Sequence, residues 1–207
     1  PRMTNTNPIF KPPKSRRLVS AWMVPEHADH ALDRVEQFQD IFDQVIFMCH
    51  DVNPDGSLPT RWPIAERKEL AAKFREMGVS ALNDYSGDTE TFAALTAAPN
   101  TLETAIVNMV EECEETGADG VDIDFEQLPR ESRFAFTEFI AKLSQALHAR
   151  GKMLSICTNA PSSSSRRDGG IGFLELPTLA YYVDHLRPMH YDLFGPWNPE
   201  VVGPTST

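Results

Sequence analysis

The chain has 207 residues, of which 41% are hydrophobic and 24% are charged. A chain of this length can bury one sizeable core, which indicates a single domain or part of a larger one. Its 30 acidic and 19 basic residues give a net charge of −11, which argues against nucleic acid or an anionic membrane as the main partner.

Residues 1–16 are rich in proline and polar residues and lack hydrophobic periodicity, so a tail or linker is predicted there. Residues 17–207 are expected to form the folded domain. No apolar run approaches the roughly 18 residues of a membrane-spanning helix, and no signal-peptide pattern is visible. Because the chain begins with Pro1 rather than Met, a removed leader stays an open alternative.

Strand and helix patterns alternate along the domain. In chain order they predict a strand over 17–25, a helix over 27–38, a strand over 42–52, a helix over 61–78, a strand over 79–87, a helix over 99–117, a strand over 117–126, a helix over 129–151, a strand over 152–161, a helix over 176–183 and a strand within 184–195. Gly78 and Gly117 end two of the helices. An Asn/Thr cap is expected to open the helix over 99–117, and Pro129 lies near the first turn of the next one.

Strands that are mostly apolar on both faces and alternate with helices are typical of a parallel sheet covered by helices. Two α/β architectures fit: a (β/α)8 barrel of the TIM type and an open doubly wound sheet. No GxGxxG or GxxxxGK[ST] motif follows any strand, which disfavours a nucleotide-binding doubly wound domain.

The three cysteines, Cys49, Cys113 and Cys157, are far apart and form no CxxC or Cys/His pattern. Cys49 and Cys157 end the apolar strand patterns VIFMC and MLSIC. Buried free cysteine behaves as a small hydrophobic residue. All three are therefore predicted to be free and structural, which argues against a disulfide framework or a structural zinc site.

The segment GADGVDIDFEQLP, residues 117–129, places acidic residues at alternate positions of an apolar strand. Because side chains alternate between the faces of a strand, Asp122, Asp124 and Glu126 share one face, opposite to apolar neighbours. A sheet covered by helices on both faces would bury these carboxylates at high cost. In a barrel the acidic face points inward, where water, ligand and polar side chains are available. The pattern therefore favours the barrel.

Carboxylates this close cannot all ionise freely, because like charges raise the pKa of at least one. Glu126 comes last and is therefore closest to the C-terminal rim, where barrel enzymes place their chemistry. A protonatable Glu126 with Asp124 two positions deeper has the form of a general acid and the group that tunes it. An acidic turn and a metal site built from the same acids are the alternatives, although no convergent His or Asn set accompanies them.

Two motifs resemble those of family-18 glycoside hydrolases, the chitinase-like enzymes. DGVDIDFE resembles the family's DGxDxDxE signature on the fourth strand, and MHYD, residues 189–192, resembles its MxYD motif on the sixth. The specified positions of the first motif are filled by Asp119, Gly120, Asp122, Asp124 and Glu126. The third strand carries LNDYSGD where the family often has SxGG, a departure that resembles the cell-wall and spore-cortex branch more than typical chitinases.

The resemblance implies that residues 17–207 are a partial catalytic barrel with about six of the eight (β/α) units. It also implies retaining, substrate-assisted hydrolysis of β-linked glycans that contain N-acetylglucosamine. Glu126 is the implied general acid. Asp124 would orient the substrate's acetamide N–H, and Asp122 would share a proton with Asp124 and tune it. Tyr191 would bind the acetamide oxygen, and Asp192 would hold the sugar.

Other polar and aromatic residues are candidates for the cleft. Trp22 and Trp197 would stack on sugar faces, with core packing as the alternative. Asn83, Asp84 and Asn159 end predicted strands and would line the cleft.

The expected partner is an oligo- or polysaccharide that contains N-acetylglucosamine. No cofactor, metal, nucleic acid or membrane insertion is expected, and the oligomeric state is open. The resemblance favours an extracellular or cell-wall location. It does not separate chitin, peptidoglycan and N-glycan cores as substrates, nor endo from exo action.

Six strand–helix units are fewer than the eight of a closed barrel. A fragment, an open sheet and completion by other chains are the alternatives. Two other functions also stay open: a non-catalytic sugar-binding relative, against which the presence of Glu126 argues, and a metal-dependent hydrolase that uses the same acids, against which activity in a chelator would argue.

Overall fold

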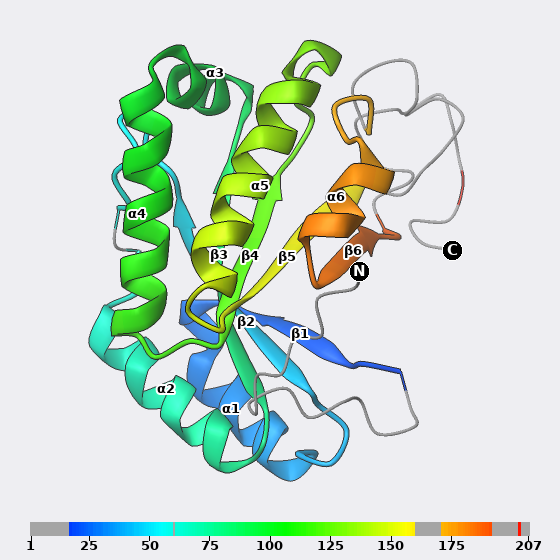
Figure 1. Ribbon diagram of the computed structural model, residues 1–207. Coiled ribbons are helices and arrows are strands. Elements are labelled where there is room, and N and C mark those ends of the chain that lie inside the picture. The colour runs from blue at the N-terminus through cyan, green and yellow to red at the C-terminus, as the bar shows by residue number, and fades with distance from the viewer. Residues whose placement is uncertain (1–16, 60, 160–170, 192–202, 204–207) are drawn as a thin grey trace.

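A computed structural model describes residues 17–59, 61–159, 171–191 and 203. Its strands form one parallel sheet in the order β1-β2-β3-β4-β5-β6 (Figure 1). They are β1 Ser20–Met23, β2 Gln44–Asp51, β3 Ser80–Gly87, β4 Gly120–Phe125, β5 Met153–Asn159 and β6 His185–Met189. Each strand pairs with the one before it in the chain, which is the order of a barrel wall rather than that of a doubly wound sheet.

Helices connect the strands. Their bounds are η1 Pro25–His27, α1 Ala28–Gln37, α2 Ile64–Glu76, α3 Thr89–Ala97, α4 Pro99–Glu115, η2 Arg130–Ser132, α5 Arg133–His148 and α6 Leu176–Tyr182. Gly78 and Gly117 follow α2 and α4 with φ of 76° and 69°, as expected for glycines that end helices.

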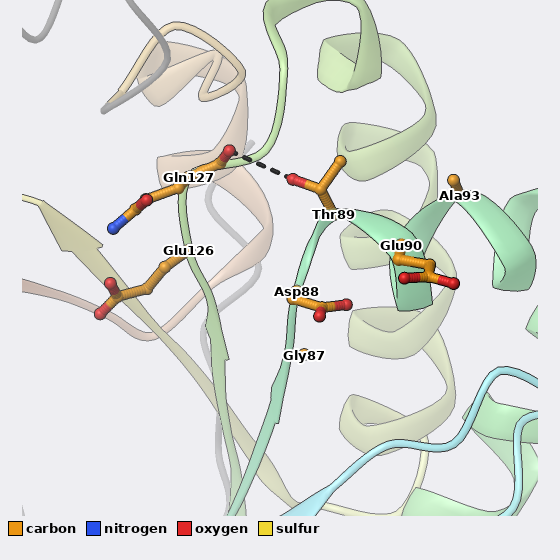
Figure 2. A pocket seen from close by; sticks show the side chains of 7 residues that line it. All are labelled: Gly87, Asp88, Thr89, Glu90, Ala93, Glu126 and Gln127. Atoms are coloured by element: carbon orange, nitrogen blue, oxygen red, sulfur yellow. Dashed lines mark hydrogen bonds between the residues drawn. The ribbon is translucent and has the colours of Figure 1, made fainter.

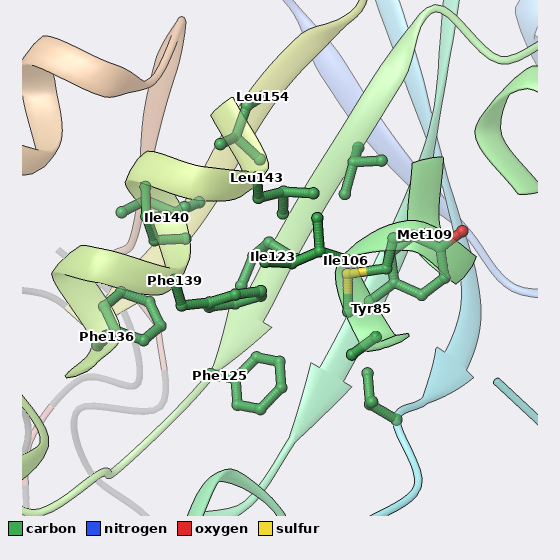
Figure 3. Packing of buried hydrophobic residues seen from close by; sticks show 14 of the residues in the cluster. Tyr85, Ile106, Met109, Ile123, Phe125, Phe136, Phe139, Ile140, Leu143 and Leu154 are labelled. Carbon is green, nitrogen blue, oxygen red and sulfur yellow. The ribbon is translucent and has the colours of Figure 1, made fainter. Parts of the chain in front are cut away.

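The larger hydrophobic cluster lies between the helices and β3, β4 and β5 (Figure 3). Ile123 and Phe125 of β4 point into it, and Phe125 packs edge-on against Phe139 of α5 with ring centroids 5.9 Å apart. A second cluster packs α1 and α2 against β1, β2 and β3. The predicted apolar face of β4 is therefore the face that the helices cover, and this leaves the acidic face for the other side of the sheet.

The structure corrects the helix boundaries at one place. No element was predicted between residues 88 and 98, but α3 lies there, and Asp88 caps it by accepting a hydrogen bond from the Thr91 backbone N–H at 2.8 Å. The predicted Asn/Thr cap of the next helix is wrong. Ala98 is its N-cap residue without a side-chain bond, and Pro99 begins the helix. Proline suits the first helical position, because its missing N–H would have no helical partner there.

The three cysteines are free and buried, as predicted. Among the described residues, no helix combines the length and the apolar character that crossing a membrane requires. The predicted tail over residues 1–16 lies outside the described part of the chain.

Candidate active site

Glu126 directly follows the last residue of β4. The next residue, Gln127, has φ 53°, in the left-handed region that side chains other than glycine rarely adopt. The backbone therefore turns sharply beyond Glu126. A pocket of about 620 Å³ opens beside it, lined also by residues of the β3–α3 connection and α3. Figure 2 shows the Glu126 side chain directed away from the α3 residues that form the other wall.

Asp122 is fully buried on the acidic face of β4 and accepts hydrogen bonds from three side chains. Ser155 and Cys157 of β5 donate to it, the latter at 3.2 Å between Sγ and Oδ2. Arg187 of β6 donates from Nε to Oδ1 at 3.1 Å and forms an ion pair. These three side chains supply the hydrogen bonds that a fully buried carboxyl group requires.

Arg187 ties the acid to the first two strands. Its two remaining guanidinium nitrogens donate to Ser20 Oγ of β1 and Gln44 Oε1 of β2, both at 2.6 Å. Its guanidinium carbon lies 5.6 Å from the ring centroid of Trp22. Sequence reasoning missed Arg187, although a charged residue two positions before the MHYD motif, inside a strand, was a signal for it.

Asp124 is half-buried two positions further along β4. Burial, together with the negative charges of Glu126 and Asp122, raises the pKa of its carboxyl to about 6, and a hydrogen bond from Cys157 partly offsets these effects. Its Oδ1 atom is buried without a hydrogen-bond partner among the described residues. Asp124 is therefore an acid that changes charge near neutral pH.

Asp84 of β3 stands beside Asp122 in the parallel register of the sheet and is 3% exposed. Burial raises the pKa of Asp84 well above its ordinary value, and the charges of Asp122, Asp124 and Asp51 add to that effect. The structure thus adds the carboxyl group of Asp84, which the sequence predicts to line the cleft, to the acidic face of the sheet.

The structure places Asn83 on the opposite, helix-covered face. It is fully buried, donates to Thr116 Oγ1 at 3.0 Å, and accepts from Arg67 of α2 at 3.1 Å. The prediction that Asn83 lines the cleft is therefore wrong. Neighbouring positions of a strand face opposite sides, and in β3 it is Asp84 that shares the side of the acids.

The remaining candidates lie in or just after β1, β5 and β6, or outside the described residues. Trp22 is 39% exposed and lies on the acidic side, against Arg187. Asn159 ends β5 in a half-buried position and shares the strand face of Ser155 and Cys157. Tyr191 follows β6 and is 55% exposed, and its predicted approach to Glu126 stays a prediction. The candidates outside the described residues are Asp192 and Trp197.

Within the part of the chain that the structure describes, no group of three or more His, Cys, Asp or Glu side chains is arranged so that it could hold a metal ion.

Comparison with known proteins points to one family. The sequence model of "Glycosyl hydrolases family 18" matches residues 75–207. The chain is 28% identical over 169 residues to "Probable chitinase 10" of Drosophila melanogaster, a match that covers 76% of this chain and 7% of that protein. The chain thus spans a small part of that relative.

Solved structures share the fold. A class V chitinase from Pseudomonas fluorescens Pf-5 has a TM-score of 0.80 at 20% identity, and the match covers 92% of this chain and 61% of the chitinase chain. The spore cortex-lytic enzyme SleL of Bacillus megaterium has a TM-score of 0.74 at 17% identity, covering 86% and 42%. The predicted (β/α)8-type fold, with about six units in this chain, is confirmed by the six parallel strands in sequential order and by these structures. Because both kinds of enzyme share the fold, the branch within the family stays a prediction.

Proposed function

Because the chain belongs to family 18 of the glycosyl hydrolases, we propose that it forms the acid-bearing part of a glycosidase that cleaves β-linked glycans containing N-acetylglucosamine. The observation that carries the proposal is the line of Asp122, Asp124 and Glu126 along one face of β4 and just beyond its carboxyl end. The name of the Drosophila relative, a probable chitinase, supports this substrate class.

In the proposed reaction Glu126 donates a proton to the glycosidic oxygen, and the bond between that oxygen and the anomeric carbon breaks. The acetamide oxygen of the substrate attacks the anomeric carbon and forms an oxazolinium ion. Glu126, now a carboxylate, removes a proton from water as the water opens this ring. The position of Glu126 just beyond the carboxyl end of β4 supports the assignment, because barrel enzymes place their chemistry at that rim.

Asp124 must be ionised to orient the acetamide N–H and to balance the positive charge that develops. Its pKa of about 6 supports this role, since the group is ready to ionise near neutral pH. The proposed role of Asp122 is to act on Asp124 through its own charge and to share a proton with it. Tyr191 and Asp192 are proposed to hold the sugar at the cleavage site, and Trp22, Asn159 and Trp197 are proposed to contact the glycan.

The test replaces Glu126 by Gln, which keeps the shape of the side chain but cannot donate the proton. Hydrolysis of an N-acetylglucosamine oligomer is expected to fall by about 10² to 10⁴-fold, while calorimetry still detects oligomer binding. Glu131→Gln is the matched control, because Glu131 lies in the next connection and is exposed. Equal turnover by Glu126→Gln and the parent protein, in a chain that is active, would refute the acid role.

A further inference from the structure

One carboxylate of the acidic group has no part in the proposed reaction. Asp84 enters from β3, and its backbone is directly opposite that of Asp122 on β4. Both side chains are buried, Asp84 at 3% and Asp122 at 0% exposure. The acid group therefore contains at least three carboxylates close together on two neighbouring strands: Asp84, Asp122 and Asp124.

The hydrogen bonds distinguish these acids. Asp122 accepts from a serine, a cysteine and the Arg187 guanidinium. Asp84 keeps one buried oxygen, Oδ1, for which the described residues supply no hydrogen-bond partner. A buried ionised carboxylate is very costly unless it is paired and hydrogen-bonded. Among the described residues, the guanidinium that bonds to these acids is that of Arg187, and it bonds to Asp122. Asp124 also has a buried Oδ1 without a partner there, but Asp124 is half-buried whereas Asp84 is 3% exposed, so Asp84 is the acid that is least equipped to carry a charge.

Charged and titratable groups on β2, β4, β5 and β6 reinforce this difference. The titratable or charged groups that act on Asp84 are Asp51 and Cys49 of β2, Asp122 and Asp124 of β4, Cys157 of β5 and Arg187 of β6. The carboxylates among them repel a further negative charge, and the positive charge of Arg187 opposes that repulsion.

We propose that Asp84 is a positioning residue that keeps its proton in the folded protein at neutral pH, and so favours the ionised form of Asp124 close to it. The proposal rests on the proposed function, because the ionised Asp124 is what the substrate's acetamide requires. A neutral Asp84 limits the excess negative charge of the group, whereas an ionised Asp84 would drive the proton onto Asp124.

The test uses stability rather than activity. A folded chain that retains a proton on Asp84 binds one more proton than the unfolded chain above about pH 4, the ordinary pKa of aspartate. The contribution of Asp84 to the stability of the parent protein should therefore fall as the pH rises, and Asp84→Asn, which has no proton to lose, should lack this loss. The folding equilibrium constant of the variant relative to the parent should rise by up to about tenfold per pH unit above pH ~4, until Asp84 itself ionises.

The measurement is urea unfolding of the 207-residue chain and its variants between pH 4 and pH 8. Asp33→Asn, at an exposed position of α1, is the control and should show no such slope. A relative stability of Asp84→Asn that is constant or falls with rising pH would overturn the proposal, because Asp84 would then be ionised in the folded protein.

A second measurement tests the proposal even if Asp84→Asn does not fold. In the parent protein with ¹³C-labelled aspartate carboxyls, NMR should detect one carboxyl that is still protonated at pH 7. If all of the aspartate carboxyls are ionised at that pH, the proposal fails. Neither measurement involves a substrate, so a failure of the proposed glycosidase function would appear in the Glu126→Gln assay and not here.

Discussion

At the scale of single residues, the site depends on one buried cation. Arg187 contacts Asp122, Ser20, Gln44 and the ring of Trp22, and so links β6 to β4, β1 and β2. Its side chain is 6% exposed and that of Asp122 is 0% exposed. Removing one partner of such a pair leaves a buried charge without compensation, which is more costly than the loss of an exposed pair.

We therefore expect Arg187→Met to lower the free energy of unfolding by about 3–5 kcal/mol. The control is Arg61→Met, which breaks the exposed pair with Glu26 at 62% and 57% exposure and should cost at most about 1 kcal/mol. Urea unfolding at pH 7 measures both. Adding Asp122→Asn to Arg187→Met should recover part of the loss, since both charges are then gone. Equal effects of the two arginine variants would contradict the importance of the buried pair.

At the scale of elements, two adjacent residues of β3 belong to polar networks on opposite faces of the sheet. Asn83 joins the sheet to α2 and α4 through Arg67 and Thr116, and Arg67 also pairs with the buried Glu112 of α4 at 2.8 Å. Asp84 faces the acids on the other side. The same strand therefore supports the fold with one face and the candidate chemistry with the other.

This separation predicts opposite outcomes for two asparagines. Asn83→Ala should lower the free energy of unfolding by about 1–3 kcal/mol, because it leaves buried partners unsatisfied, and the folded variant should bind an N-acetylglucosamine oligomer as the parent does. Asn159→Ala should weaken oligomer binding with a smaller effect on stability. Thermal unfolding and calorimetric titration measure the two properties. If Asn83→Ala weakens binding while stability is retained, Asn83 belongs to the cleft after all.

At the scale of the whole molecule, the sheet has two open edges within the described residues. There, β1 pairs only with β2, and β6 pairs only with β5. A (β/α)8 barrel closes when its last strand pairs with its first, and the solved Pseudomonas chitinase is covered over 61% of its length. Unpaired edge strands expose backbone N–H and C=O groups that can pair with another chain.

We therefore expect residues 1–207 by themselves to self-associate at micromolar concentration and to have little activity. Light scattering gives the mass in solution. An assay against a chain extended by two further strand–helix units tests whether closure restores activity, because the rim loops of those units would complete the wall of the cleft. A short chain that is monomeric, folds cooperatively and is as active as the longer one would show that closure is not needed.

The alternation of apolar and acidic residues in β4 was enough to predict which side chains share a face. Ile123 and Phe125 pack under the helices, and Asp122 and Asp124 face the other side, as the period of two requires. The order of strands and helices was likewise sufficient to predict a parallel sheet of barrel type, because local periodicity reports burial directly.

Only the tertiary structure decided how the polar residues of the other strands divide between the two faces. Asn83 and Asp84 are adjacent and both polar, so the period of two does not say which of them faces the acids. Packing of α2 and α4 decides it, since Arg67 and Thr116 are there to bind an asparagine. The partnership of Asp122 with Arg187 joins residues 65 positions apart, and a local pattern cannot report such a contact because it exists only once the strands between them have paired.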